Sequence, residues 1–127
     1  NVGFYLTGDK ATFRFGFESL IYLTAPKTGL MAGVLFFEDR AAPANRNHTI
    51  LSSNARTLLG TIYLPRGILT VAALQPVADA SAYTALVVNR LNMAGSPTLS
   101  LNANYSATDI PVPEGVGPTG GQVFLRE

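Results

Sequence analysis

Three charged residues in a row, Glu38, Asp39 and Arg40, end the apolar stretch GLMAGVLFFEDR. Two carboxylates at a defined separation perform the acid–base chemistry of glycoside cleavage, so one hypothesis is a polysaccharide-cleaving site on a β-helical scaffold. Successive side chains of a strand point to opposite faces, however, so Glu38 and Asp39 are badly placed to act as a pair. We favour a structural role in which Asp39 caps the turn after the strand and Arg40 pairs with a carboxylate or with loop carbonyls.

The other reactive side chains give weaker signals. His48 is the only histidine and lies in the polar run NRNHT, and the chain has no cysteine, so a metal site would need carboxylates around one imidazole. We interpret His48 as a solvated loop residue. Ser52 or Ser53 would be the nucleophile of a triad with it, but the GxSxG pattern of a nucleophile elbow is absent. We expect no catalytic residue, metal or cofactor.

Aromatic side chains offer one more kind of site, because exposed tyrosines can stack on sugar rings. In strands, tyrosine more often packs in the core or at its rim. We interpret the tyrosines as packing residues, with a sugar-binding ladder as the alternative. They are Tyr5, Tyr22, Tyr63, Tyr83 and Tyr105.

The composition limits the scaffold that can position these residues. Of the 127 residues, 47% are hydrophobic and 13% are charged, and there are 12 glycines and 8 prolines. This indicates one all-β domain, because helical bundles need many charged residues on their solvent faces. The net charge of +1, without a Lys/Arg cluster, argues against nucleic-acid binding. No apolar run reaches the ~20 residues that span a bilayer, so we expect any membrane anchor to lie upstream of Asn1.

Apolar and β-branched runs separated by turn residues predict strands along most of the chain. Residues 81–93 also show helical spacing of apolar side chains, but their Tyr, Thr and Val content favours a strand. The predicted strands are residues 3–8, 11–17, 20–25, 32–37, 48–51, 56–64, 67–74, 83–93 and 98–105. The structural turn candidates are Gly33, Asp39, Arg40, Gly60 and Pro65.

Three segments repeat one layout, an apolar run, a short turn and a second apolar run. Such repeats indicate stacked units that share one core. With tight turns and no crossover helix, the pattern predicts an all-β, single-stranded β-solenoid (parallel β-helix-like) with short coils over residues 1–108, with a β-sandwich as the alternative. Residues 109–127 are rich in Pro and Gly and predict an extended segment. The predicted core residues are Leu35, Phe37, Ile62, Leu64, Leu69 and Val71.

Two blocks, LTAPKTGLMAGVLFFEDR and LLGTIYLP, carry a resemblance to a known family. Together with YLTG before them and YTALVVNRLNMAGSPTLSLNA after them, they resemble the C-terminal region of TadG-like proteins of the bacterial tight-adherence (Flp) pilus system. The resemblance covers residues 3–102. It implies a non-enzymatic structural or interaction domain of the cell envelope, on its periplasmic or extracellular side, linked to pilus assembly and adhesion. The implied partners are proteins of the pilus or secretion machinery. A carbohydrate-active or carbohydrate-binding β-helix is the alternative.

The ends of a solenoid predict self-association, because they expose unpaired backbone groups and apolar side chains to other chains. The start of the chain, NVGFYLTG, is apolar and has no polar cap. We expect an upstream region to cover it in a longer protein, and the isolated domain to associate through this end. The Pro-rich segment 111–118 suits a cap at the other end.

Overall fold

The computed structural model describes residues 2–8, 10–95 and 98–113, and these are almost entirely β or irregular. The strands are β1 (Phe4–Leu6), β2 (Arg14–Phe15), β3 (Leu20–Thr24), β4 (Val34–Glu38), β5 (Asn47–Ile50), β6 (Asn54–Val71) and β7 (Thr84–Met93). The one helix in these ranges is a 3-10 turn, η1 (Tyr105–Ala107). No helix of the described residues is long and apolar enough to cross a membrane. The all-β prediction is confirmed.

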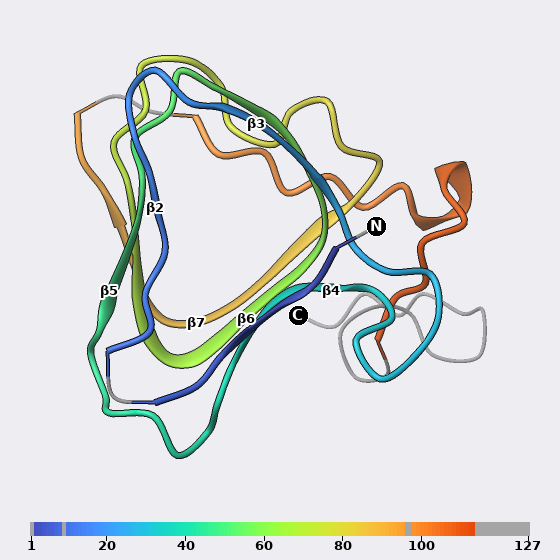
Figure 1. The fold of residues 1–127 in the computed structure, drawn as a ribbon. Coiled ribbons are helices and arrows are strands. Elements are labelled where there is room, and N and C mark those ends of the chain that lie inside the picture. The colour runs from blue at the N-terminus through green and yellow to red at the C-terminus, as the bar shows by residue number, and fades with distance from the viewer. Residues whose placement is uncertain (1, 9, 96–97, 114–127) are drawn as a thin grey trace, which may run out of the picture.

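All pairings between the named strands are parallel, and β6 is at their centre. One path across the sheet runs β1-β4-β6-β7 and another runs β2-β5-β6-β7, while β3 pairs with the first part of β6. β6 can pair with all four of these strands, β3, β4, β5 and β7, because it bends, with a register shift against β7 between Leu64 and Ile68. The result is a curled parallel sheet that the chain follows around a triangular outline, with β6 and β7 turning the same corner (Figure 1).

This pairing is consistent with a β-helix-like fold and differs from that of a β-sandwich. Antiparallel pairs build a β-sandwich, whereas the one antiparallel contact among the described pairings is the isolated bridge Tyr83–Ala103. The strand predicted at residues 83–93 is confirmed as β7.

Two predictions about strand limits are wrong. Pro65 was expected in a turn but lies inside β6, at residues 65–67, which have no register partner in β4, β5 or β7. Because no ladder bond is needed there, the missing N–H of proline is tolerated at the bend. Residues 98–105 form no strand and pair only through the bridges at Leu99 and Ala103. Their neighbour, segment 72–83, is itself not a strand and offers no continuous ladder.

The core fills the inside of the curl, and the predicted core is correct at every position except Phe37. Phe37 is only half-buried, while its neighbour Phe36 is 2% exposed. The register of β4 on β6 shifts between Val34 and Phe36, and such a bulge moves the inside–outside alternation by one residue. The predicted core residues that are buried are Leu35, Ile62, Leu64, Leu69 and Val71.

Residues 109–113 of the predicted C-terminal segment lie against the core. Ile110 is buried in it, and the Tyr83 hydroxyl donates to the carbonyl of Pro111 at 2.5 Å. Gly33 has a φ of 79°, and a side chain there would collide with the Pro111 carbonyl, so glycine permits this close approach. The turn candidate Gly60 lies inside β6. Residues 114–127, including most of the predicted Pro-rich cap, lie outside the described residues.

Candidate functional site

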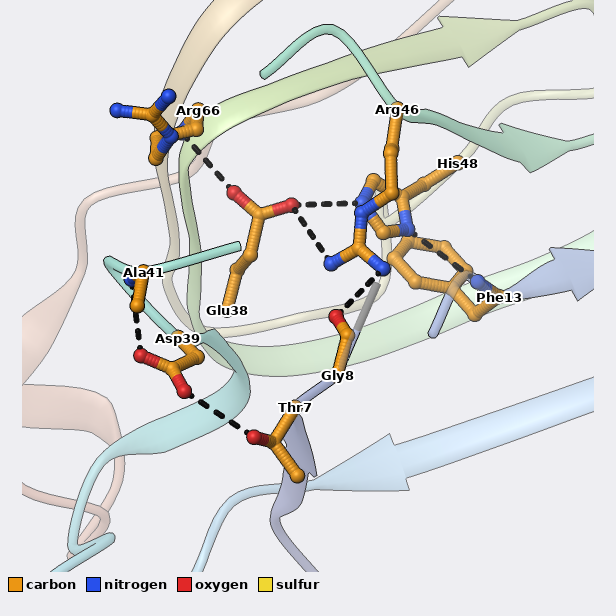
Figure 2. A network of polar contacts seen from close by, with 9 residues as sticks. All are labelled: Thr7, Gly8, Phe13, Glu38, Asp39, Ala41, Arg46, His48 and Arg66. Carbon is orange, nitrogen blue, oxygen red and sulfur yellow. Dashed lines mark hydrogen bonds and ion pairs between the residues drawn. The ribbon is translucent and has the colours of Figure 1, made fainter. Parts of the chain in front are cut away.

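Asp39 lies at the turn where β4 ends. Its carboxylate accepts hydrogen bonds from the Ala41 N–H at 3.0 Å and from the Thr7 hydroxyl at 3.1 Å (Figure 2). These two bonds, the first more than the second, lower the pKa of Asp39 from its ordinary value of 3.8. This is the turn-capping contact that the sequence predicts, and it also joins the turn to the segment after β1.

Arg40 has a different partner from the one predicted. Its Nε donates to the hydroxyl of Tyr63 at 3.0 Å, and its guanidinium carbon lies 5.8 Å from the centre of the Tyr63 ring. The described residues thus give Arg40 a tyrosine as its partner, where the sequence predicted a carboxylate or a loop carbonyl. Arg40 reaches Tyr63 because Tyr63 faces outward from β6, the strand that pairs with β4. Strand pairing between distant segments creates this contact, so no local pattern signals it.

Glu38 points the other way, into the curl, as alternation along the strand requires. Its side chain is 0% exposed. One carboxylate oxygen accepts the Arg66 N–H at 2.9 Å, and the other lies 3.2 Å from Nε2 of His48 and 3.7 Å from Nη2 of Arg46 (Figure 2). We call Glu38, Arg46 and His48 the buried charged cluster. Glu38 and Asp39 do not form a carboxylate pair.

His48 is fully buried, so its interpretation as a solvated loop residue is wrong. β5 begins at Asn47, and its alternation places His48 and Ile50 inside. Nδ1 of His48 accepts the Phe13 N–H at 3.2 Å, which leaves the ring proton on Nε2 to be donated to Glu38. Both ring nitrogens of the neutral histidine therefore have a hydrogen-bond partner. The signal was the strand predicted at residues 48–51, because alternation along a strand puts His48 and Ile50 on the same face.

Arg46 and Gly67 complete the surroundings of the cluster. The Arg46 side chain is 10% exposed, and its Nη1 donates to the carbonyl of Gly8 at 3.0 Å. A side chain at Gly67 would begin 3.0 Å from the Glu38 carboxylate and 3.0 Å from the His48 ring. Glycine at the bend of β6 therefore leaves room for the cluster. Neither Arg46 nor Gly67 is predicted from the sequence as part of a site.

The buried charged cluster has the residue types of an acid–base site but lacks solvent access. Neither Glu38 nor His48 keeps a free polar atom, whereas Nε and Nη2 of Arg46 are buried without a hydrogen-bond partner. Glu38 and His48 are both 0% exposed and are bound to each other. Both oxygens of Glu38 and both nitrogens of His48 have partners within the protein. No group of His, Cys, Asp or Glu that could hold a metal ion occurs in the described part of the chain. The arrangement neutralises buried charge and links segments that are far apart in the sequence.

The serines considered for a triad do not join His48. Ser52 is buried, and its hydroxyl donates to the carbonyl of Ser19 and accepts the N–H of Asn54. The hydroxyl of Ser53 donates to the carbonyl of Phe17 at 3.4 Å. Through these bonds the serines connect the turn between β2 and β3 to the turn between β5 and β6. No Ser–His hydrogen bond is formed by either residue.

The tyrosines also fail to form one ladder. Tyr83 is fully buried, which raises its pKa to about 12, and it contacts Tyr105 at a ring distance of 5.2 Å. Tyr22 is 73% exposed on β3. Tyr5 and Tyr63 lie in an outward column with Phe37 between them. The tyrosines thus divide between core packing and the outer surface.

The burial of His48 predicts a pH-dependent stability. Burial lowers the pKa of His48 below its ordinary 6.5, against the hydrogen bond to Glu38, which raises it. A lowered native pKa means that the stabilisation is complete above about pH 6.5 and is lost as the pH falls through this value. We expect urea unfolding at pH 5.5 to give a smaller free energy than at pH 7.5, by at most ~1.4 kcal/mol per pH unit for one proton.

Two measurements check the assignment to His48. In the folded protein, the NMR resonances of the single histidine should titrate below 6.5, without ambiguity because no other histidine exists. His48→Gln should make the free energy of unfolding depend less on pH between 5.5 and 7.5. A native titration above 6.5, or an unchanged slope in His48→Gln, would contradict the prediction.

Asp39→Asn should lower the melting temperature, because the ionised carboxylate binds the Ala41 N–H and the Thr7 hydroxyl more strongly than an amide oxygen does. Thermal unfolding followed by circular dichroism measures the shift. Glu18→Gln, at an exposed carboxylate, is the matched control and should change the melting temperature less. Equal melting temperatures in Asp39→Asn and the unchanged protein would refute the capping role.

No protein-family model, curated protein or solved structure matches this chain, so no relative assigns a role to these residues.

Proposed function

We propose that the chain forms a short parallel β-solenoid and acts as a non-enzymatic structural or interaction domain. Strand register supports the solenoid, because residues in register form columns through successive strands. The inward columns are Phe4, Phe36, Ile62 and Leu86 on one side, and Phe15, Ile50, Val71 and Met93 on the next. Columns of this kind are how stacked coils share one core.

The observation that carries the non-enzymatic proposal is the closure of the buried charged cluster. Glu38 binds Arg46 and His48 from the segment before and within β5, and the backbone of Arg66 from the bend of β6. Arg46 and His48 in turn bind Gly8 and Phe13, from the segment between β1 and β2. A buried charge needs its partners, so the cluster favours one register of the stacked segments over its alternatives.

The outward aromatic column supports a packing role over sugar binding. Phe37 lies between Tyr5 and Tyr63, with ring centres 5.7 and 4.9 Å apart and tilts of 33° and 32°. At this spacing the two tyrosines cover both faces of Phe37, and a stacked sugar needs a free face. The guanidinium of Arg40 lies over Tyr63 as well. The carbohydrate-binding alternative has little support on this surface.

The cellular context of the proposal comes from the resemblance to TadG-like proteins. From this resemblance we expect the domain in the bacterial cell envelope, on the periplasmic or extracellular side, where it would contribute to pilus assembly and adhesion. Its partners would be proteins of the pilus or secretion machinery. A stiff stacked sheet suits such a role, because it holds a constant surface for partners to bind.

Enzyme assays test the non-enzymatic part. The purified chain is incubated with a panel of acidic and neutral polysaccharides, and new reducing ends and unsaturated products are measured. We expect no product from the unchanged protein. Product formation that disappears in a folded Glu38→Gln variant and persists in Glu18→Gln would overturn the proposal in favour of a carbohydrate-active enzyme.

A deletion experiment tests the pilus role. In the bacterium that encodes the chain, its coding region is deleted and pili are counted by electron microscopy, with surface attachment measured in parallel. We expect both to fall and to recover when the unchanged chain is restored. Normal pili and normal attachment in the deletion strain would contradict the pilus role.

A further inference from the structure

The exposed large apolar side chains are confined to two parts of the described chain, before Met31 and after Ala73. They include Phe4 and Tyr5 on β1, which are 40% and 56% exposed, and Leu91 and Met93 on β7, which are 40% and 42% exposed. β1 and β7 are the two ends of the path β1-β4-β6-β7. The sheet is therefore well covered in its middle strands and leaves apolar surface at two opposite edges.

Within the described residues, each of these edges has a side on which no strand pairs, and the one backbone contact there is the Thr84 N–H at the start of β7, which donates to the carbonyl of Asn102. β1 pairs with β4 alone, and β7 pairs with β6 as its only strand partner. Phe4 stacks one face of its ring on Phe36, with ring centres 5.2 Å apart and an angle of 15°. Leu91 and Met93 are in register with the buried Leu69 and Val71, so they point inward and are exposed only because nothing described stacks on them.

We propose that copies of this chain stack head to tail, with β7 of one copy pairing in parallel with β1 of the next. The inference rests on the proposed solenoid. All strands along the path run in one direction, so this contact continues the existing ladder without reversing it. Extending the columns by one step places Leu86 on Phe4 and Val87 on Tyr5.

The chemistry of the two edges fits this contact. On the second side of the curl, the same step places Leu91 beside Phe13 and Met93 beside Phe15, so apolar residues again meet apolar residues. No charged side chain has to enter the interior columns. Since the two edges differ, the contact does not close on itself, and each added copy leaves a new free edge for another.

Cysteine cross-linking tests the contact, because the chain has no cysteine of its own. Tyr5→Cys and Val87→Cys are made as separate variants with tags of different mass, and each is oxidised alone and in an equimolar mixture. Positions 5 and 87 of one molecule are separated by β4 and β6, roughly 14 Å at the usual strand spacing, which is too far for a disulfide. We expect mixed dimers in the mixture and far fewer dimers in either single variant.

The double variant Tyr5→Cys/Val87→Cys should then form a ladder of covalent oligomers, while Tyr5→Cys/Ser53→Cys, with its second cysteine away from the column, should not. Sedimentation of the unchanged protein should show a mean mass that rises with concentration. Monomer at every concentration, or Tyr5→Cys dimers as abundant as the mixed dimers, would overturn head-to-tail stacking.

A fold control separates this inference from the proposed solenoid. Thr49 and Thr70 are register partners on β5 and β6, so Thr49→Cys/Thr70→Cys should form a disulfide within one molecule. If this disulfide does not form, the stacked fold itself is wrong. If it forms and the mixture of Tyr5→Cys and Val87→Cys gives no mixed dimer, only the head-to-tail contact is wrong.

Discussion

Ile62→Ala should lower the free energy of unfolding by ~2–5 kcal/mol, the range for truncating a buried Ile or Leu to alanine. Ile62 is 1% exposed and lies between Phe36 of β4 and Leu86 of β7 in an inward column. Removing its side chain leaves a cavity that backbone pairing on both sides prevents from closing. Urea unfolding at pH 7.5, above the titration of His48, measures the change.

Ile68→Ala is the matched control for Ile62→Ala. Ile68 is the same residue type in the same strand, and it is half-buried on the outer face, in register with Asn47 and Arg90. Truncating Ile68 should lower the free energy of unfolding clearly less than truncating Ile62. A loss below about 0.5 kcal/mol for Ile62→Ala, typical of a surface substitution, would show that this part of β6 faces water.

Glu38→Ala should destabilise the protein by ~3–5 kcal/mol, the loss found when one partner of a buried ion pair is removed. The variant leaves Arg46, 10% exposed, without its carboxylate, and it removes the acceptors of the His48 Nε2–H and the Arg66 N–H. Glu38→Gln should cost less, because an amide oxygen can still accept one of these bonds. Urea unfolding of the unchanged protein, Glu38→Ala and Glu38→Gln gives the order of their free energies of unfolding directly.

Glu18→Ala controls for the loss of a carboxylate in general, because Glu18 is exposed. We expect its free energy of unfolding to be close to that of the unchanged protein. If Glu38→Ala were no more destabilising than Glu18→Ala, the buried charged cluster would not stabilise the fold, and its proposed role in setting the register would be wrong.

The cluster also explains why a residue pattern that resembles an active site is compatible with a structural protein. Glu38, His48 and an arginine are common in catalysis, but here they face a closed interior and bind one another and nearby backbone groups. The exposed part of the motif, Asp39 and Arg40, binds a turn and a neighbouring tyrosine. These residue types allow acid–base chemistry as a hypothesis, and the burial of Glu38 and His48 removes the solvent access that such chemistry needs.

The sequence by itself determined the features that depend on neighbouring residues. Composition predicted the all-β class, Tyr, Thr and Val content predicted strand β7, and the apolar runs predicted buried positions such as Ile62 and Leu69. The turn cap at Asp39 was predictable because its acceptor and donor lie two residues apart.

Only the tertiary structure decided what depends on distant segments. The bulge in β4 buries Phe36 in place of Phe37, and pairing with β6 sets the position of this bulge. The bend of β6 at Pro65 and the burial of His48 likewise arise where β6 meets strands from elsewhere in the chain, because register and burial belong to the assembled sheet and not to a local run of residues.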